Sequence, residues 1–523
     1  MAPPKSSRFS KGIRLVAEAA FGEARRALGL NPSVQPTARL AIERWLGALG
    51  PVPPERGRVL ITALRSRTWV EWAAYAACVL RRRGWTTTLL YRSSQVTRLY
   101  NEPSYFNFWF RVRDIPGIEL VDLDALPVGD ITPAYRALAE DLAPACIAYD
   151  CHVEEADVNA DRATYGSRVA ALSAECSRSA DALECFLRSR PTFHRFLCYS
   201  GLIAESPGLL AAARKVGQET FCLEGWSWRP GHMIYNRNAP ALEYNVRGWM
   251  AADGGWTEEK EREIDRYLKF LDGETRSDAW LDNFYRIQRA EVSAKLLPHV
   301  RKFVEGDAPL FLCAPNVIGD SSMLRRETIF AGMRPWLREL IAWFRARPHL
   351  KLVIRAHPAE VWVGAKCALH VGAFAREEAA GAANILVIDA TEPTNTFSLL
   401  PFARAGLVWI SSAGVDFPVR GLPCMAAGRP KYTGLGVVEE PANREIYFAT
   451  LARWAESAPR PSAEQIRAGK QFLHMVFKGF SFEAGSRTYY ADQLFLGAMP
   501  SQEEHDRFFS IIIGESPQPD GVS

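Results

Sequence analysis

Short hydrophobic segments typical of buried β-strands alternate with helix-like segments twice along this chain. In the first half these strand-like segments lie at 58–64, 86–91, 195–202 and 219–225, and in the second half at 308–315, 351–358, 384–389 and 405–412. Short buried strands that alternate with helices predict parallel sheets covered by helices on both faces. The sequence therefore predicts an α/β protein with two separate parallel sheets.

The length of the chain, 523 residues, agrees with two domains because it exceeds what one ordinary hydrophobic core accommodates. We expect a helical extension at 1–50, a first Rossmann-like domain at 51–300, a second at 301–472, and C-terminal helices with a disordered tail at 473–523. The two domains should face one another across a cleft, with the C-terminal helices packing back. A long helical region is expected near 132–190.

The composition excludes several classes of function. The chain carries 63 basic and 59 acidic residues, and its net charge of +4 is too mild for a dedicated nucleic-acid binder. Its 10 cysteines form no Cys-x-x-Cys pair and no cluster with other ligands, so we expect reduced thiols, no metal site and a cytoplasmic location. No hydrophobic run is long enough to span a bilayer, but the basic N-terminal segment is compatible with peripheral association with the inner membrane.

Polar residues follow four of the predicted strands of the second domain. They are Asp320 in NVIGDSS, Arg355, His357 and Glu360 in RAHPAE, Asn395 in DATEPTN, and Ser411, Ser412 and Gly414 in SSAG. The carboxyl ends of parallel strands share one edge of a sheet, and the ligands of such sheets bind beyond that edge. We therefore expect these residues to line one binding site.

The residue types at this edge suit an anion. Pro358 restricts His357 to extended geometry, and an imidazole fixed in this way can donate to a phosphate oxygen or protonate a leaving phosphate. Arg355 can hold a phosphate or a carboxylate with two hydrogen bonds, or it can pair with Glu360. The hydroxyls and backbone N–H groups near Ser412 suit a phosphate as well. The alternatives are a structural histidine and an ordinary helix cap.

The order of these motifs is similar to that of a known family. The chain resembles the capsule polysaccharide biosynthesis proteins, which are Kdo-transferase-type glycosyltransferases of the GT-B fold, in RAHPAE at 355–360, the serine pair at 411–412, Asp416-Phe417, Gly421-Leu422-Pro423 and Gly428. The His-Pro and Ser-Ser pairs are also similar to those of bacterial sialyltransferases. The resemblance covers about 305–440 and implies that His357, Ser411 and Ser412 hold the phosphate of a nucleotide sugar.

The first domain offers candidates for an acceptor site. Glu224 ends a predicted strand and is a candidate general base for an acceptor hydroxyl. In the loop that follows, Trp226 is a candidate for stacking on a sugar ring, and Arg229 and His232 are candidates for contact with an acidic group; the alternative is a packed turn. In the second domain, Asp320 is a further catalytic candidate that would orient the acceptor or bind ribose, unless it only caps a turn.

Together these features predict a cytoplasmic glycosyltransferase that builds the bacterial cell surface. It would transfer a CMP-activated acidic sugar, such as Kdo, to a capsular or other surface polysaccharide or to a glycolipid. We expect no cofactor beyond this nucleotide-sugar co-substrate, and no metal, because no Asp-x-Asp motif stands at a strand end.

Two alternatives remain open. The His-Pro pair and the Ser-x-x-x-Asp-Phe pattern are also similar to CDP-glycerol-type polyol-phosphate transferases. The second alternative is a non-catalytic GT-B-like protein that binds an assembling polysaccharide or scaffolds a capsule export complex.

Overall fold

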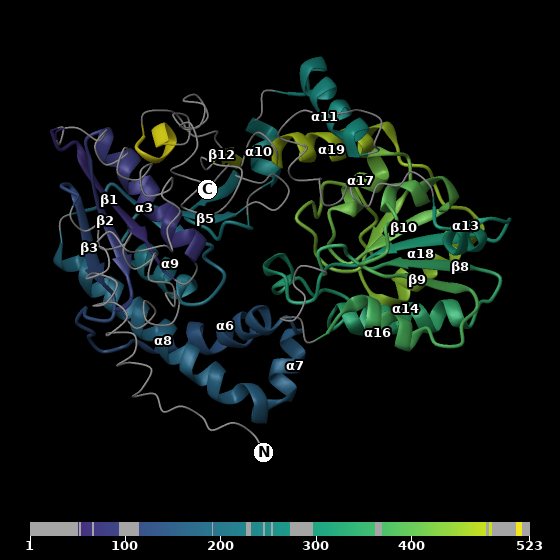
Figure 1. Cartoon of the computed structure of the whole chain (residues 1–523), viewed down its shortest axis with the longest axis horizontal. Helices are drawn as coiled ribbons and strands as arrows, with labels where there is room; N and C mark the ends of the chain where they lie inside the picture. Colours follow the sequence, from purple (N-terminus) through teal and green to yellow (C-terminus); the bar gives the residue numbers. More distant parts are fainter. Residues whose placement is uncertain are drawn as a thin grey trace, which may run out of the picture.

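The computed structural model describes residues 51, 54–64, 67–93, 115–190, 192–225, 232–243, 246–252, 255–271, 296–360, 369–476, 481–483 and 509–514. These residues form two lobes, each built on one sheet with helices around it (Figure 1). The helical extension predicted at 1–50 lies outside the described residues.

The first lobe contains a seven-stranded sheet. Its strands are β1 (Gly57–Thr62), β2 (Trp85–Tyr91), β3 (Ile118–Asp122), β4 (Arg195–Tyr199), β5 (Thr220–Gly225), β6 (His232–Arg237) and β12 (Ser481–Glu483). They lie in the order β12-β6-β5-β4-β1-β2-β3. Strands β1 to β5 run parallel, β6 pairs antiparallel with β5, and β12 pairs antiparallel with β6. The parallel part therefore has the Rossmann order, with the strand order reversing between β1 and β4.

The second lobe contains a five-stranded sheet. Its strands are β7 (Leu310–Ala314), β8 (Lys351–Arg355), β9 (Ile385–Ile388), β10 (Ala405–Val408) and β11 (Cys424–Ala426). They lie in the order β11-β10-β7-β8-β9, and all neighbours are parallel. This is the same Rossmann order, with β7 in the central place that β1 takes in the first sheet. The prediction of two Rossmann-type parallel sheets is confirmed.

Helices cover both sheets. They are α3 (Arg67–Arg82), α6 (Pro133–Cys151), α7 (Glu155–Ala160), α8 (Arg162–Ser189), α9 (Ser206–Lys215), α10 (Val246–Ala252), α11 (Glu258–Leu271), α13 (Pro298–Val304), α14 (Met333–Arg345), α16 (Val371–Glu378), α17 (Ala413–Val419), α18 (Arg444–Glu456) and α19 (Ala463–His474). Helix α3 packs on β1, β2 and β3, α9 packs on β4 and β5, and α17 packs on β10 and β11.

The spacing of hydrophobic residues explains how a helix such as α14 attaches to its sheet. Trp336, Leu337, Leu340, Ile341 and Phe344 recur three to four residues apart and are all buried. This spacing gives the helix one hydrophobic face. The neighbouring strand β8 is instead buried at four successive positions, because helices cover both faces of a parallel sheet.

Helices α6, α7 and α8 form a helical arm of the first lobe that reaches the second lobe (Figure 1). Glu154, at the start of α7, accepts a hydrogen bond from the backbone N–H of Arg334 at 2.9 Å. The guanidinium of Arg334 donates back to Glu154 at 3.1 Å and also binds Asp157. A Cβ atom at Gly332 would lie 3.1 Å from both Glu154 carboxylate oxygens, so glycine gives the carboxylate room. We call Glu154, Asp157 and Arg334 the inter-lobe latch.

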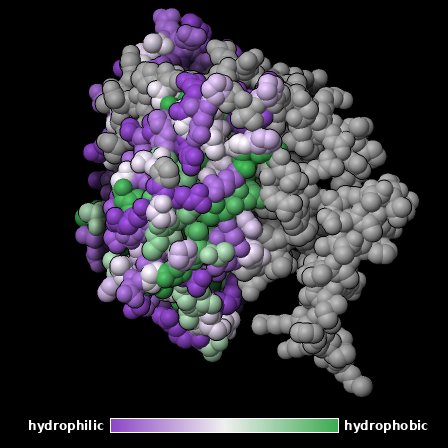
Figure 2. Space-filling model, turned by 90° about the vertical axis from the view of Figure 1, so that its left-hand side faces the viewer, coloured by the Kyte–Doolittle hydropathy of each residue, from purple (hydrophilic) through white to green (hydrophobic). Residues whose placement is uncertain are grey.

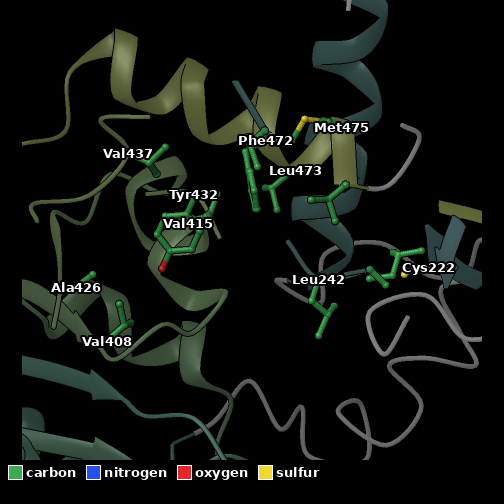
Figure 3. Close-up of a cluster of buried hydrophobic side chains, with 14 of the residues drawn as sticks. Cys222, Leu242, Val408, Val415, Ala426, Tyr432, Val437, Phe472, Leu473 and Met475 are labelled. Atoms are coloured by element: carbon green, nitrogen blue, oxygen red, sulfur yellow. The ribbon is translucent and has the colours of Figure 1, made fainter. Parts of the chain in front are cut away.

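The C-terminal part of the chain packs back on the rest of the molecule. At the end of α19, the ring of Phe472 packs edge-on against Tyr432 of the second lobe. Leu473 and Met475 belong to the same hydrophobic cluster, which includes Leu242 of the first lobe (Figure 3). Strand β12 then extends the sheet of the first lobe. Residues 509–514 bury Phe509 and three isoleucines in the core around α3. The predicted return of the C-terminal segment is confirmed.

The outer face of the first lobe carries mainly hydrophilic side chains with a band of hydrophobic ones between them (Figure 2).

Across the described ranges, no helix is both long enough and hydrophobic enough to cross a bilayer. The nine cysteines within those ranges are all free thiols.

Several elements differ from the sequence expectations. The short strands β3, β6 and β11 were not predicted. The region expected to be helical from Leu473 to Phe509 includes strand β12, and much of it lies outside the described residues. Helix α13 packs against β9, so the chain reaches the second lobe before residue 301.

Ile512→Ala tests whether the C-terminal segment is part of the core of the first lobe. The Ile512 side chain is 0% exposed, so its truncation should lower the stability of this lobe by about 2–5 kcal/mol. Equilibrium urea unfolding measures the change. The matched control is Ile446→Ala, because Ile446 is 44% exposed, and it should change stability by less than about 0.5 kcal/mol. Equal effects of the two substitutions would contradict the placement.

Candidate functional site

The carboxyl edges of the two sheets meet at one buried carboxylate. Glu224 lies near the end of β5 in the first lobe. Its Oε2 accepts a hydrogen bond from Ser200 Oγ at 2.9 Å, and its Oε1 accepts one from Ser321 Oγ at 2.8 Å. Ser200 follows β4 of the same lobe, whereas Ser321 follows β7 of the second lobe. The hydrogen bond between Ser321 and Glu224 therefore joins strand ends from both lobes.

Ser200 has a backbone conformation that aims its hydroxyl at Glu224. Its φ is 54°, which is uncommon for a residue with a side chain and costs on the order of 1–3 kcal/mol. The hydroxyl also accepts the backbone N–H of Leu202 at 3.4 Å, so its own proton is directed to the carboxylate. The strained backbone of Ser200 thus places a buried hydroxyl that fixes the orientation of the Glu224 carboxylate.

Burial raises the pKa of the Glu224 carboxyl. The hydroxyls of Ser321 and Ser200 and the charge of Lys431 oppose this rise, whereas the carboxylate of Asp320 adds to it. A carboxyl group whose pKa is raised toward the working pH suits a general base. The role of Glu224 as a general base stays a prediction.

Lys431, which lies shortly beyond β11, faces the same carboxylates. Burial lowers the pKa of its ammonium group to about 8, and the negative charges of Asp320 and Glu224 oppose this change. On this value most of Lys431 is charged at pH 7. Arg326 lies close enough that its positive charge also lowers the pKa of Lys431. The site thus contains cations and carboxylates side by side.

Asp320 stands between these groups and His357. It caps the short 3₁₀ helix η1 (Ser321–Met323), because its Oδ1 accepts the backbone N–H of Ser322 at 3.2 Å. The alternative interpretation of Asp320 as a turn cap is thus observed. Its charge nevertheless acts on Glu224, Lys431 and His357. A role toward a substrate stays a prediction.

His357 lies just beyond β8 and is half-buried. Its Nδ1 accepts the backbone N–H of Ala359 at 3.1 Å, so the proton of the neutral ring is on Nε2. Burial lowers the pKa of the imidazole, the charge of Arg355 lowers it further, and Asp320 opposes both. No residue in the described part of the chain accepts a hydrogen bond from Nε2. This N–H can therefore donate to water or to a ligand.

The strand order of the second sheet reverses between β7 and β10, and sheets of this kind bind their ligands at such a point. Asn316, beyond β7, accepts the backbone N–H of Ile410 at 3.1 Å and joins the two strand ends. Ser411 and Ser412 follow directly. His357 follows strand β8, which lies on the other side of β7 from β10. About two strand spacings, roughly 10 Å, therefore separate the end of β8 from the serine pair. A phosphate that contacts both must lie across the end of β7.

The segment around Ser411 is held by Tyr432. The Tyr432 hydroxyl donates to the backbone carbonyl of Ser411 at 2.7 Å, and Ser411 Oγ accepts the N–H of Ala413 at 3.3 Å. The Ser412 side chain makes no capping hydrogen bond to α17. A Cβ atom at Gly414 would lie 1.9 Å from the Tyr432 hydroxyl, so only glycine fits there. Ser412 is the hydroxyl of this pair that a ligand can reach.

Arg355 and Glu360 serve the structure of the second lobe. The guanidinium of Arg355 donates to the backbone carbonyls of Asp389 and Glu392 and is almost fully buried. Glu360 accepts the backbone N–H of Val371 at 2.8 Å, at the start of α16. Burial raises the pKa of the Glu360 carboxyl, and this N–H opposes the rise. The side chains of Arg355 and Glu360 are both engaged in these contacts within the lobe. Their role in substrate binding stays a prediction.

Two further predicted residues, Asn395 and His232, can be placed in the structure. Asn395 caps the 3₁₀ helix η3 (Thr396–Phe402) by accepting the N–H of Phe397 at 2.8 Å. Trp226 and Arg229 lie outside the described residues, and His232 begins β6. Within the described part of the chain, no three His, Cys, Asp or Glu side chains are grouped so that they could hold a metal ion.

The structure brings together Glu224, Asp320 and His357, and it adds three residues that the sequence did not single out. These are Ser200, Ser321 and Lys431. The signal for Ser200 and Ser321 was their place at strand ends. Lys431 follows β11, which was not recognised as a strand, so its place at the same edge was missed.

No protein-family model and no curated protein matches this chain. Among solved structures it is similar to Thermosulfurimonas dismutans KpsC, described as a β-Kdo 2,4-transferase, with 18% identity over 53% of this chain and 78% of that chain and a TM-score of 0.33. KpsC from the same organism, described as a β-Kdo 2,7-transferase, gives 14% identity over 55% and 79% and a TM-score of 0.32. UDP-GlcNAc 2-epimerase from Neisseria meningitidis shows 11% sequence identity over 81% of this chain and 100% of that chain, with a TM-score of 0.25. Likenesses this distant assign no activity.

Gly414→Ala tests the packing of the serine segment. The added methyl group collides with the Tyr432 hydroxyl and should cost about 1–3 kcal/mol of stability. Removal of that hydroxyl in Gly414→Ala/Tyr432→Phe should recover part of the loss. The control is Gly166→Ala in α8, where the nearest atom lies 3.9 Å from the added Cβ and no loss is expected. Thermal unfolding measures all three, and a Gly414→Ala protein as stable as wild type would refute the contact.

Proposed function

We propose that this chain is a glycosyltransferase of the GT-B type, whose second lobe binds a nucleotide-sugar donor and whose first lobe binds the acceptor. The observation that carries the proposal is the buried Glu224 carboxylate, which hydroxyls of both lobes hold where the carboxyl edges of two Rossmann-type sheets meet. A titratable group with a raised pKa at such a place is a candidate for catalysis. The resemblance of the motifs to the Kdo-transferase-type family supports the same activity.

On the donor side, the phosphate of the nucleotide lies across the end of β7. His357 Nε2 donates to it from one side and Ser412 donates from the other. Because the imidazole is neutral, it binds through a hydrogen bond and not through charge. The charge of Lys431 supplies the nearby electrostatic attraction for an anion.

On the acceptor side, Glu224 acts as the general base. It takes the proton of an acceptor hydroxyl, the hydroxyl oxygen forms a bond to the anomeric carbon, and the bond from that carbon to the phosphate oxygen breaks. The nucleotide leaves with the electron pair of that bond. His357 and Ser412 stabilise the charge that develops on the leaving phosphate.

For the donor we propose a CMP-activated acidic sugar, such as Kdo. For the acceptor we propose a capsular or other surface polysaccharide, or a glycolipid, reached at the cytoplasmic face of the inner membrane. The motifs that carry the resemblance, at 355–360 and 411–428, support these assignments.

Glu224→Gln should abolish transfer while leaving the donor bound. Glutamine keeps the size of the side chain and can accept one of the two serine hydrogen bonds through its carbonyl oxygen, but it cannot take a proton, so kcat should fall by at least about 100-fold. The measurement is transfer of a labelled sugar from the donor, together with donor affinity by calorimetry. Glu243→Gln is the matched control, because Glu243 is exposed and should show wild-type rates. Substantial turnover by the Glu224→Gln protein would exclude Glu224 as the base.

His357→Ala should weaken nucleotide binding, because the charged phosphate loses the hydrogen bond that the neutral imidazole donates. The expected loss is about 10- to 100-fold in affinity. A thermal-shift series with CMP, CDP, UDP and GDP measures it, since a ligand of the native state raises the melting temperature. We expect CMP to give the largest rise. His349→Ala is the matched control, because His349 is exposed ahead of β8.

The same series separates the alternatives. A preference for CDP would favour the polyol-phosphate transferase. If no nucleotide raises the melting temperature of the wild-type protein, the non-catalytic binding protein is favoured and the proposal fails.

A further inference from the structure

The hydroxyl of Ser321 donates a direct hydrogen bond from the second lobe to Glu224. Its Oγ lies 2.8 Å from Glu224 Oε1 and 3.3 Å from Asp320 Oδ1. A serine hydroxyl has one proton, so it can donate to one carboxylate at a time. The shorter distance indicates that it donates to Glu224.

The surroundings of Glu224 divide between the lobes. Ser200 belongs to the same lobe as Glu224 and keeps its hydrogen bond wherever the second lobe lies. The charged groups that face Glu224 are Lys431 and Asp320, and both come from the second lobe. The positive charge of Arg326 in turn lowers the pKa of Lys431, and the negative charge of Asp320 raises the pKa of His357. The second lobe therefore brings burial, one hydroxyl donor and a pair of opposite charges to the carboxylate.

Contact between the lobes removes water from Glu224. A carboxylate that loses water is disfavoured in its charged form unless other donors replace the water. Lys431 and Asp320 have opposite charges and partly offset one another at Glu224. Of the groups described in the second lobe, Ser321 is the one that donates directly to the carboxylate.

We propose that Ser321 is a positioning residue: it replaces water on Glu224 when the lobes meet, and so keeps the carboxylate ionised and fixed in the enclosed site. This inference rests on the proposed function of Glu224 as the general base. Without this hydrogen bond, burial would favour the neutral carboxylic acid more strongly, and that form cannot take the proton of the acceptor.

The test is the pH profile of kcat, whose acid limb reports the base in the enzyme–substrate complex. In Ser321→Ala this limb should move up by about one pH unit, because a hydrogen bond to a charged group is lost. The rate should then fall about tenfold on the acid side and approach the wild-type rate on the alkaline plateau. Ser321→Thr keeps the hydroxyl and should restore the wild-type profile.

Ser322→Ala is the matched control, because it removes the neighbouring hydroxyl, while Ser322 contacts Asp320 through its backbone N–H. It should leave the profile unchanged. The proposal is overturned if Ser321→Ala leaves the limb in place, moves it to lower pH, or is matched by Ser322→Ala. Melting temperatures of all three variants establish that each one is folded.

A second readout does not depend on turnover. Infrared difference spectroscopy follows the carboxyl band of Glu224, which is assigned by its loss in Glu224→Gln, and Ser321→Ala should raise the midpoint of its titration. If the midpoint rises but no donor is turned over by wild type, the proposed function fails and the role of Ser321 stands. If wild type transfers sugar and the midpoint does not move, the role of Ser321 fails alone.

Discussion

A carboxylate buried where two lobes meet constrains the structure around it. Burial of Glu224 costs free energy unless hydrogen bonds replace the lost water, and Ser200 and Ser321 supply these bonds from the two lobes. Hydrogen bonds weaken steeply when donor and acceptor move apart. The relative position of the lobes is therefore tied to the same contacts that prepare the site. Strain at Ser200 agrees with this, because the surrounding structure must hold the unusual backbone in place.

Two other contacts between the lobes contribute in different ways. In the inter-lobe latch, Arg334 and Glu154 are largely buried, so the cost of removing their charges from water offsets much of their mutual attraction. The hydrophobic cluster that includes Leu242 and Phe472 removes apolar surface from water and is the larger stabilising contribution. We infer that burial of this cluster holds the lobes together, while the directional contacts of the latch determine how they are oriented.

The sequence predicted the buried strands well, because a parallel strand covered on both faces is hydrophobic at successive positions. It failed at β3, an edge strand with polar residues between its hydrophobic ones, and at β11, which has three residues. Position at a strand end led to Glu224 and His357, and the charge of Asp320 acts on both of them in the structure. It could not separate them from Arg355, whose guanidinium turns to loop carbonyls, because strand position does not fix side-chain direction. The partner of Glu224 depends on how the lobes meet, which no local pattern contains.

The charges at the site limit the kind of anion it accepts. Glu224 and Asp320 repel an anion, while Lys431 and Arg326 attract one, so the two pairs nearly balance. A neutral His357 adds no charge to this balance, and it binds through the orientation of its Nε2–H. Under the proposed function, recognition of the donor phosphate therefore depends on the directions of the hydrogen bonds that His357 and Ser412 donate, and gains little from net attraction.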